Sequence, residues 1–115
     1  MLIVRRAQME ALREVPRRAF YREVLATARR DLPEVCGAKG DEELLETIAW
    51  ATTRARTIGL VAPPHVARFA LFVLRHGRDF EARPDTAWAA AILRERRLVG
   101  PKKLERLEAR EREGG

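Results

Sequence analysis

The stretch Val66-Ala-Arg-Phe-Ala-Leu-Phe-Val-Leu74 decides the fold of this 115-residue chain, because no other segment is apolar on almost every side. Elsewhere, short apolar stripes alternate with arginine and glutamate. A helix that is apolar on all sides has to be covered on all sides. We therefore expect an all-α fold, a single compact bundle of about five helices around a central helix over about 64–76. Its centre should hold Phe69, Ala70, Val73 and Leu74.

The residues before this stretch carry the pattern of long helices. A helix is expected over 5–32, where Pro16 removes a backbone donor and predicts a kink or a break; alternatively, Pro16 begins a second helix. After a loop with two glycines, Asp41 is placed to cap a helix that continues to about Thr57 with one apolar face. Gly59 is expected to end this helix in a left-handed conformation.

Prolines and polar residues mark the elements around and after the central helix. Pro63 or Pro64 can begin the central helix, because a proline fits the first helical turn. Phe80, in the irregular segment that follows, is expected to fold back onto the core. Asp85 or Thr86 is placed to cap the next helix.

The end of the chain is a highly charged segment. Residues 102–115 should form a last helix or tail, in which Leu104 and Leu107 are the only large apolar side chains. With so little to bury, this helix should be the least stable. The total length fits one helical domain over 1–115.

Charge and cysteine content narrow the class of protein. The chain has 23 basic and 17 acidic residues and a formal net charge of +6. Because the two signs are interleaved, most of this charge is expected on solvated helix surfaces. The single cysteine, Cys36, excludes an internal disulfide and suits a reducing compartment. The sequence shows neither a signal-peptide pattern nor the roughly 20 apolar residues of a membrane span, so we expect a cytoplasmic protein.

Arginine clusters leave a nucleic-acid-binding or regulatory helical module as the alternative function. Such a module needs exposed cations that contact phosphates. The helices on either side of Gly59 also resemble a helix-turn-helix superficially. However, the second of these helices is too apolar to present polar side chains to base edges, which argues against that motif. The candidate phosphate contacts are Arg17, Arg18, Arg29, Arg30, Arg94, Arg96 and Arg97.

Residues that could carry catalysis or bind a metal are few and scattered. His65 and His76 lie about 16 Å apart along one helix and so cannot share an ion. Cys36 would need a base folded onto it to act as a nucleophile. The chain has no serine and no glycine-rich phosphate loop. We therefore expect no enzyme activity, no cofactor and no metal site. Three acids sit among arginines, which favours loop capping and ion pairing: Asp79, Glu81 and Asp85.

Two aromatic residues lie off the main apolar stripes and are candidates for binding a protein partner. Trp50 flanks the stripe of its helix together with Arg54. Phe72 lies on the flank of the central helix that carries Arg68 and Arg75. Tryptophan and arginine are the side chains that most often anchor interfaces. We predict that these five residues contact a partner; the alternative is that another helix covers them.

Four short motifs resemble those of a group of bacterial sequences. They are Arg-Ala-Gln-Met-Glu-Ala-Leu over 6–12, a motif over 59–69 that begins with Gly and ends with Ala-Arg-Phe, Gly-x-Asp-Phe over 77–80 and Pro-x-x-x-Trp-Ala over 84–89. The chain is similar to uncharacterised short all-helical proteins encoded near type VI secretion spike and effector genes. Where that family has an uninterrupted first helix, this chain has Pro16.

The resemblance implies a non-enzymatic accessory role, as an adaptor, an effector-binding chaperone or an immunity-type partner. Composition and spacing do not indicate that role by themselves. The leading expectation is therefore a helical protein that binds a protein partner, an effector or a component of a bacterial secretion or contractile-injection system.

Overall fold

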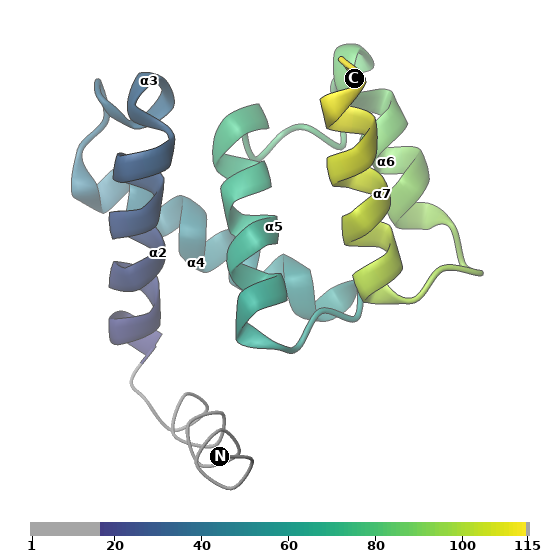
Figure 1. Ribbon diagram of the computed structural model, residues 1–115, viewed down its shortest axis with the longest axis horizontal. Helices are drawn as coiled ribbons and strands as arrows, with labels where there is room; N and C mark the ends of the chain where they lie inside the picture. The colour runs from purple at the N-terminus through teal and green to yellow at the C-terminus, as the bar shows by residue number, and fades with distance from the viewer. Residues whose placement is uncertain (1–16, 115) are drawn as a thin grey trace, which may run out of the picture.

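The computed structural model describes residues 17–114, which are helical apart from short connections and contain no strand within that range. The predicted all-α class is confirmed (Figure 1). The predictions over 1–16, including the kink or break at Pro16, lie outside the described residues. The elements are α2 (Arg17–Asp31), α3 (Pro33–Cys36), α4 (Asp41–Thr57), α5 (Pro63–His76), a 3-10 turn η1 (Pro84–Thr86), α6 (Ala87–Arg94) and α7 (Gly100–Arg112).

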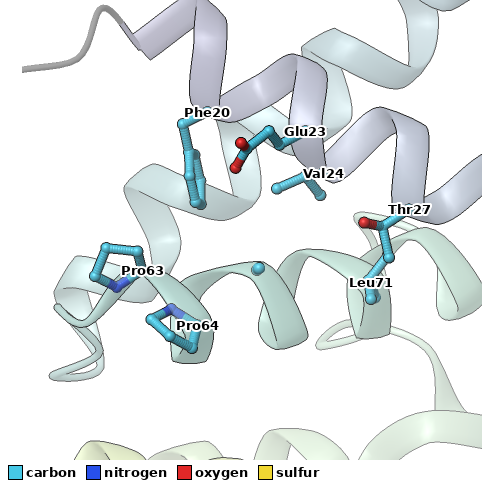
Figure 2. Close-up of a pocket in the computed structure, with 8 residues that line it drawn as sticks. Phe20, Glu23, Val24, Thr27, Pro63, Pro64 and Leu71 are labelled. Carbon is cyan, nitrogen blue, oxygen red and sulfur yellow. The ribbon is translucent and has the colours of Figure 1, made fainter. Parts of the chain in front are cut away.

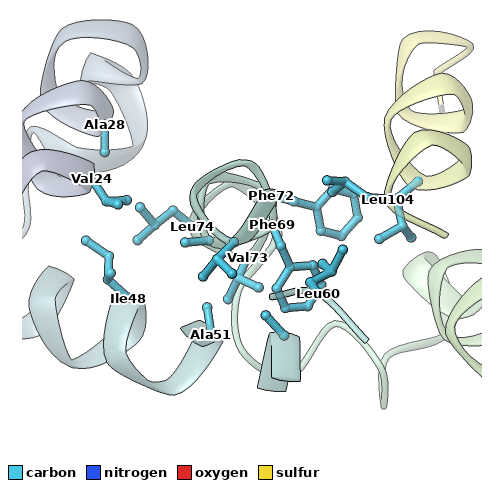
Figure 3. Packing of buried hydrophobic residues seen from close by; sticks show 14 of the residues in the cluster. Val24, Ala28, Ile48, Ala51, Leu60, Phe69, Phe72, Val73, Leu74 and Leu104 are labelled. Carbon is cyan, nitrogen blue, oxygen red and sulfur yellow. The ribbon is translucent and has the colours of Figure 1, made fainter. Parts of the chain in front are cut away.

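Helix α5 is the centre of the arrangement. It lies between α2 on one side and the α6–α7 pair on the other, while α4 crosses behind α2 and α5 (Figure 1). Its apolar residues point in several directions because each direction meets a different helix (Figure 3). The prediction of a central helix over about 64–76 is confirmed, and so is its start, since α5 begins at Pro63.

The core contains the side chains predicted for it. Phe69, Ala70 and Val73 are fully buried and Leu74 is nearly so. Phe80 folds back onto the core as expected, and its ring meets Phe69 edge-on at 6.3 Å between centroids. Burial of each large apolar side chain stabilises the fold by about 1.5–3 kcal/mol.

The turn between α4 and α5 ends α4 in the predicted way. Gly59 has φ of +89°, a conformation that L side chains rarely adopt. Its N–H donates to the carbonyl of Arg56, and the N–H of the buried Leu60 donates to the carbonyl of Ala55 at 2.9 Å. This is a Schellman motif, in which the last carbonyls of a helix are satisfied by the chain that leaves it.

The predicted cap at Asp41 is wrong, whereas Thr86 has the predicted N-cap position without a capping hydrogen bond from its side chain. Gly40 occupies the N-cap position of α4 and Asp41 is the first helical residue, where its carboxylate accepts a hydrogen bond from Arg29 Nε at 3.0 Å. Thr86 stands at the N-cap of α6, but its hydroxyl donates to the carbonyl of Phe80 at 2.5 Å and makes no cap. In both cases the side chain is oriented toward a partner other than the N–H groups at the helix start.

Helix α7 is held more firmly than its composition suggests. It begins at Gly100, whose Cα approaches the backbone of Gly59 so closely that an added Cβ would lie 2.5 Å from the Gly59 carbonyl. Leu104 and Leu107 are both fully buried. No helix within 17–114 is long and apolar enough to cross a bilayer.

Candidate functional site

The predicted partner-binding flank of α5 is covered by α7. Phe72 is fully buried, so the alternative that another helix covers it is the observed one. Its ring meets Phe80 at 5.4 Å and Trp88 at 6.0 Å, both edge-on. Leu104 of α7 approaches the same ring (Figure 3). Phe72 is therefore a core residue rather than a partner contact.

The two arginines beside Phe72 form ion pairs with glutamates of α7. Arg68 Nε donates to Glu108 at 3.0 Å, and a second nitrogen of the same guanidinium also binds that carboxylate. Arg75 donates both Nε and Nη2 to Glu111, at 2.6 and 2.7 Å. Because the Glu108 hydrogen bond favours the charged guanidinium, the pKa of Arg68 is raised.

The remaining two predicted contacts lie on α4. Trp50 is half-buried and packs against the core. Arg54 holds Glu81, in the segment after α5, through Nε at 2.8 Å and Nη2 at 2.6 Å. This hydrogen-bonded pair raises the pKa of Arg54. Of the five predicted residues, Arg68 and Arg75 therefore join α5 to α7, Arg54 joins α4 to the segment after α5, and Trp50 stays partly exposed.

The end of α5 carries the densest polar cluster. His76 Nε2 lies 2.6 Å from the Glu111 oxygen that Arg75 also binds. Partial burial raises the pKa of Glu111, but the hydrogen bonds from Arg75 and His76 outweigh it and leave that pKa below its ordinary value. The cluster is an ion-pair clasp between α5 and α7.

The acidic loop and the cysteine, the other candidates for chemistry, are occupied by ion pairs or buried in the core. Arg83 binds Asp79 at 2.6 Å and Asp85 at 3.1 Å, so the predicted pairing of this acidic loop is confirmed. Cys36 is fully buried. Within 17–114, no three histidine, cysteine or acidic side chains are grouped so that they could hold a metal ion.

The candidate phosphate contacts divide into two kinds. Arg29 and Arg30 are engaged with Asp41 and Asp31. The others are exposed on the two ends of the molecule, without an ion pair to any described side chain: Arg17, Arg18, Arg94, Arg96 and Arg97.

A groove between α2 and α5 is a concave feature that sequence reasoning missed. Its volume is about 230 Å³ and its walls are mostly apolar. One face of α2 contributes side chains at helical spacing, and the first half of α5 faces them (Figure 2). The lining residues are Phe20, Glu23, Val24, Thr27, Pro63, Pro64, Ala67 and Leu71.

The groove exists because the two helices diverge over small side chains. Ala67 is too small to fill the space between the helix axes, and Leu71 stays partly exposed beside it. Val24 is buried at the base, whereas Phe20 is only partly covered. The sequence signal nearest to the groove is the apolar character of α5 on all sides, which predicts a cover on every side. The periodicity of apolar residues does not show that the side facing α2 stays partly open.

A single carboxylate marks the groove electrostatically. Glu23 is its only charged lining residue, and its carboxylate lies beside the Phe20 ring (Figure 2). No described residue forms an ion pair or hydrogen bond with Glu23, although the arginines described above are mostly paired. An apolar trough with one unpaired acid favours an amphipathic ligand that carries a base.

Comparisons with protein-family models, with curated proteins and with solved structures find no match to this chain.

Proposed function

We propose that this chain is a non-enzymatic helical adaptor that binds a protein partner by receiving an amphipathic helix of that partner in the α2–α5 groove. The observation that carries the proposal is the groove itself, open, mostly apolar and about 230 Å³ in volume. Laying the apolar face of a helix into such a groove is a recurrent mode of protein recognition.

The lining defines the helix that fits. Phe20 and Thr27 are seven residues apart on α2, so the groove is about two helical turns long. A ligand helix therefore needs apolar residues at positions i, i+3 or i+4, and i+7. It also needs an arginine or lysine at the height of Glu23, because a carboxylate covered without a counter-charge weakens binding.

The partner class comes from the resemblance to proteins encoded near type VI secretion genes. On that basis the partner is an effector or a component of a secretion or contractile-injection system. The products of the adjacent genes are therefore the proteins to test first. Each should be co-expressed with the tagged chain and recovered through the tag.

A matched pair of variants tests whether the partner protein binds in the groove. Thr27→Arg places a long charged side chain in the groove, whereas Ala26→Arg places the same side chain on the exposed face of α2. We expect Thr27→Arg to lose the co-expressed partner and Ala26→Arg to retain it. Equal capture by both variants, with unchanged circular dichroism, would move the binding site elsewhere. Failure of the unaltered chain to retain any adjacent gene product would contradict the adaptor function.

The alternative of a nucleic-acid-binding module has one supporting observation. Arg94, Arg96 and Arg97 are exposed together where α6 ends and the chain turns toward α7. Phosphate contacts predict duplex binding that weakens steeply with salt. Absence of a shift of labelled duplex DNA at about 50 mM salt would exclude this alternative.

A further inference from the structure

Two exposed valines lie where the connection between α4 and α5 meets the connection between α6 and α7. Within 17–114, the large apolar side chains that stay exposed are Val61, at 77%, and Val99, at 66%. Val61 follows Gly59 by two residues and Val99 precedes Gly100, and the backbones of these two glycines approach each other closely. Because a chain covers at most about 3.6 Å per residue, both valines lie within about 7 Å of that approach. They therefore belong to one surface.

The same surface is basic. Between residues 94 and 97, where α6 ends, the chain has three arginines and one acidic residue. Arg94, Arg96 and Arg97 are exposed and form no ion pair with a described side chain. The carboxylate of Glu95 accepts a hydrogen bond from the backbone N–H of Arg97 at 3.2 Å, so it is held within the turn. The surface therefore combines exposed apolar side chains with an excess of cations.

The connection between α6 and α7 projects beyond the helices that it joins. Figure 1 shows it as a loop that extends outward from the end of α6 and returns to the start of α7. Helices α5 and α7 both begin at this end of the molecule, so the connection that carries Val61 lies beside the projecting loop (Figure 1). A projecting surface of this kind is suited to contact with a flat partner rather than to enclosing a ligand.

This combination of side chains matches the layered chemistry of an anionic lipid bilayer. Arginines next to such a surface are attracted by the anionic headgroups, and each contributes about fivefold to partitioning. Aliphatic side chains beside them reach the boundary between headgroups and acyl chains. The backbone of a nucleic acid also offers phosphates to the arginines, but it leaves the valines in water. A bilayer satisfies both kinds of side chain.

We infer that the surface formed by Val61, Val99, Arg94, Arg96 and Arg97, here called the valine–arginine tip, binds the face of an anionic bilayer. The arginines contact lipid phosphates and the two valines insert at the acyl boundary. The contact is peripheral and reversible, because two valines bury little apolar area. No residue of the tip lines the α2–α5 groove, so this inference does not rest on the proposed function.

Sedimentation of the full chain with lipid vesicles tests the inference. The vesicles contain equal parts of phosphatidylglycerol and phosphatidylcholine, and vesicles of phosphatidylcholine alone are the control. At about 50 mM salt we expect the chain to sediment with the anionic vesicles only, and less of it at about 200 mM, because salt screens the attraction. Recovery of the chain in the supernatant of the anionic vesicles at low salt would overturn the inference.

Two double variants with the same net charge locate the contact. Arg96→Gln with Arg97→Gln should weaken partitioning to anionic vesicles by about 25-fold, since two cations leave the tip. Arg17→Gln with Arg18→Gln removes two exposed cations from the start of α2 and should weaken it by less than about threefold. Equal losses would show that net charge alone attracts the chain, which contradicts binding through the tip.

The valines separate a bilayer from a nucleic acid. Val61→Gln with Val99→Gln keeps the charge of the tip, and we expect partitioning to fall at least about fivefold because the inserted apolar groups are lost. Ala26→Gln, on the exposed face of α2, should leave it unchanged. Undiminished vesicle binding by the double valine variant would overturn the inference. Binding of labelled duplex DNA without binding of vesicles would overturn it as well, and would assign the arginines to nucleic acid.

Discussion

At the scale of single residues, one carboxylate joins the end of α5 to α7. Glu111 accepts hydrogen bonds from the guanidinium of Arg75 and lies 2.6 Å from the imidazole of His76, so it binds two consecutive residues at the end of α5. Cations at a helix C-terminus are also favoured by the helix dipole. The side chains involved are only about a quarter exposed, which limits screening by water.

Removal of this charge should destabilise the protein measurably. Glu111→Gln leaves Arg75 partly buried without a counter-charge, and we expect a loss of about 1 kcal/mol in the free energy of unfolding in urea. Glu113→Gln, on the exposed end of the same chain segment, should change it by less than about 0.5 kcal/mol. Equal effects of the two substitutions would show that the clasp contributes nothing specific.

The same carboxylate predicts a pH dependence. The pKa of Glu111 in the folded protein lies below its ordinary value of 4.5, so its contribution to stability is present above that value and is lost as the pH falls through the folded pKa. The difference in unfolding free energy between the unaltered chain and Glu111→Gln should therefore be full at neutral pH. It should shrink in acid below pH 4.5, as measured by urea unfolding at several pH values. A difference that stays constant into acid would contradict this assignment.

At the scale of elements, α7 depends on two leucines and on one close backbone approach. Leu107 is fully buried, whereas its neighbour Arg106 is exposed. Leu107→Ala should cost about 2–5 kcal/mol of unfolding free energy, through lost burial and the cavity left behind. Arg106→Ala should leave stability nearly unchanged. A small loss for Leu107→Ala would mean that α7 contributes little to the core.

The contact between Gly59 and Gly100 gives a second test of the same helix. In Gly100→Ala the new Cβ would lie 2.5 Å from the Gly59 carbonyl, so the start of α7 has to shift, at a cost of about 1–3 kcal/mol. Gly40→Ala is the control, because nothing lies within 4 Å of its added Cβ and its φ is −76°. Melting temperatures of the two variants should differ by at least about 4 °C. Similar melting temperatures would show that the contact is easily relieved.

Local patterns predicted the elements well and their neighbours poorly. The start of α5 at Pro63, the left-handed Gly59 and the burial of Phe80 follow from conformational preferences and apolar character, which are properties of short segments. Whether Phe72 is exposed stayed open at the level of sequence, because its cover comes from a helix about 30 residues later in the chain. Periodicity tells which face of a helix is apolar and does not tell which helix packs on it.

The capping hydrogen bonds and the groove could not be predicted from the sequence for related reasons. Asp41 and Thr86 have the chemistry of N-caps, but the Asp41 carboxylate accepts from Arg29 and the Thr86 hydroxyl donates to the carbonyl of Phe80. The groove depends on the angle between α2 and α5 and on the small size of Ala67. Helices α2 and α5 are far apart in the sequence, so the groove between them is visible only in the three-dimensional structure.

At the scale of the whole molecule, the distribution of charge distinguishes the two candidate functions. The net charge of +6 comes with several arginines that form partly exposed ion pairs with acidic side chains of the same fold. Recognition through an apolar groove with one carboxylate should depend little on salt. Recognition of nucleic acid with 6–10 phosphate contacts would lose about 10³–10⁵ in affinity between 50 and 200 mM salt.

The salt dependence of partner binding is therefore a testable prediction. Its dissociation constant, measured by calorimetry with the purified partner, should change by less than about tenfold between 50 and 200 mM salt, because apolar burial supplies most of the affinity. A steeper loss would favour the exposed arginines of the α6–α7 turn as the binding surface.

The position of α7 in the chain has a consequence for biosynthesis. During translation α7 leaves the ribosome after all the helices that it covers, and domains fold as their segments emerge. Until it arrives, the Phe72 ring and the Arg75 guanidinium have neither their cover nor their counter-charge. A chain that ends before residue 100 therefore lacks the part of the cover of Phe72 that α7 supplies, and its aromatic cluster is open to capture by chaperones.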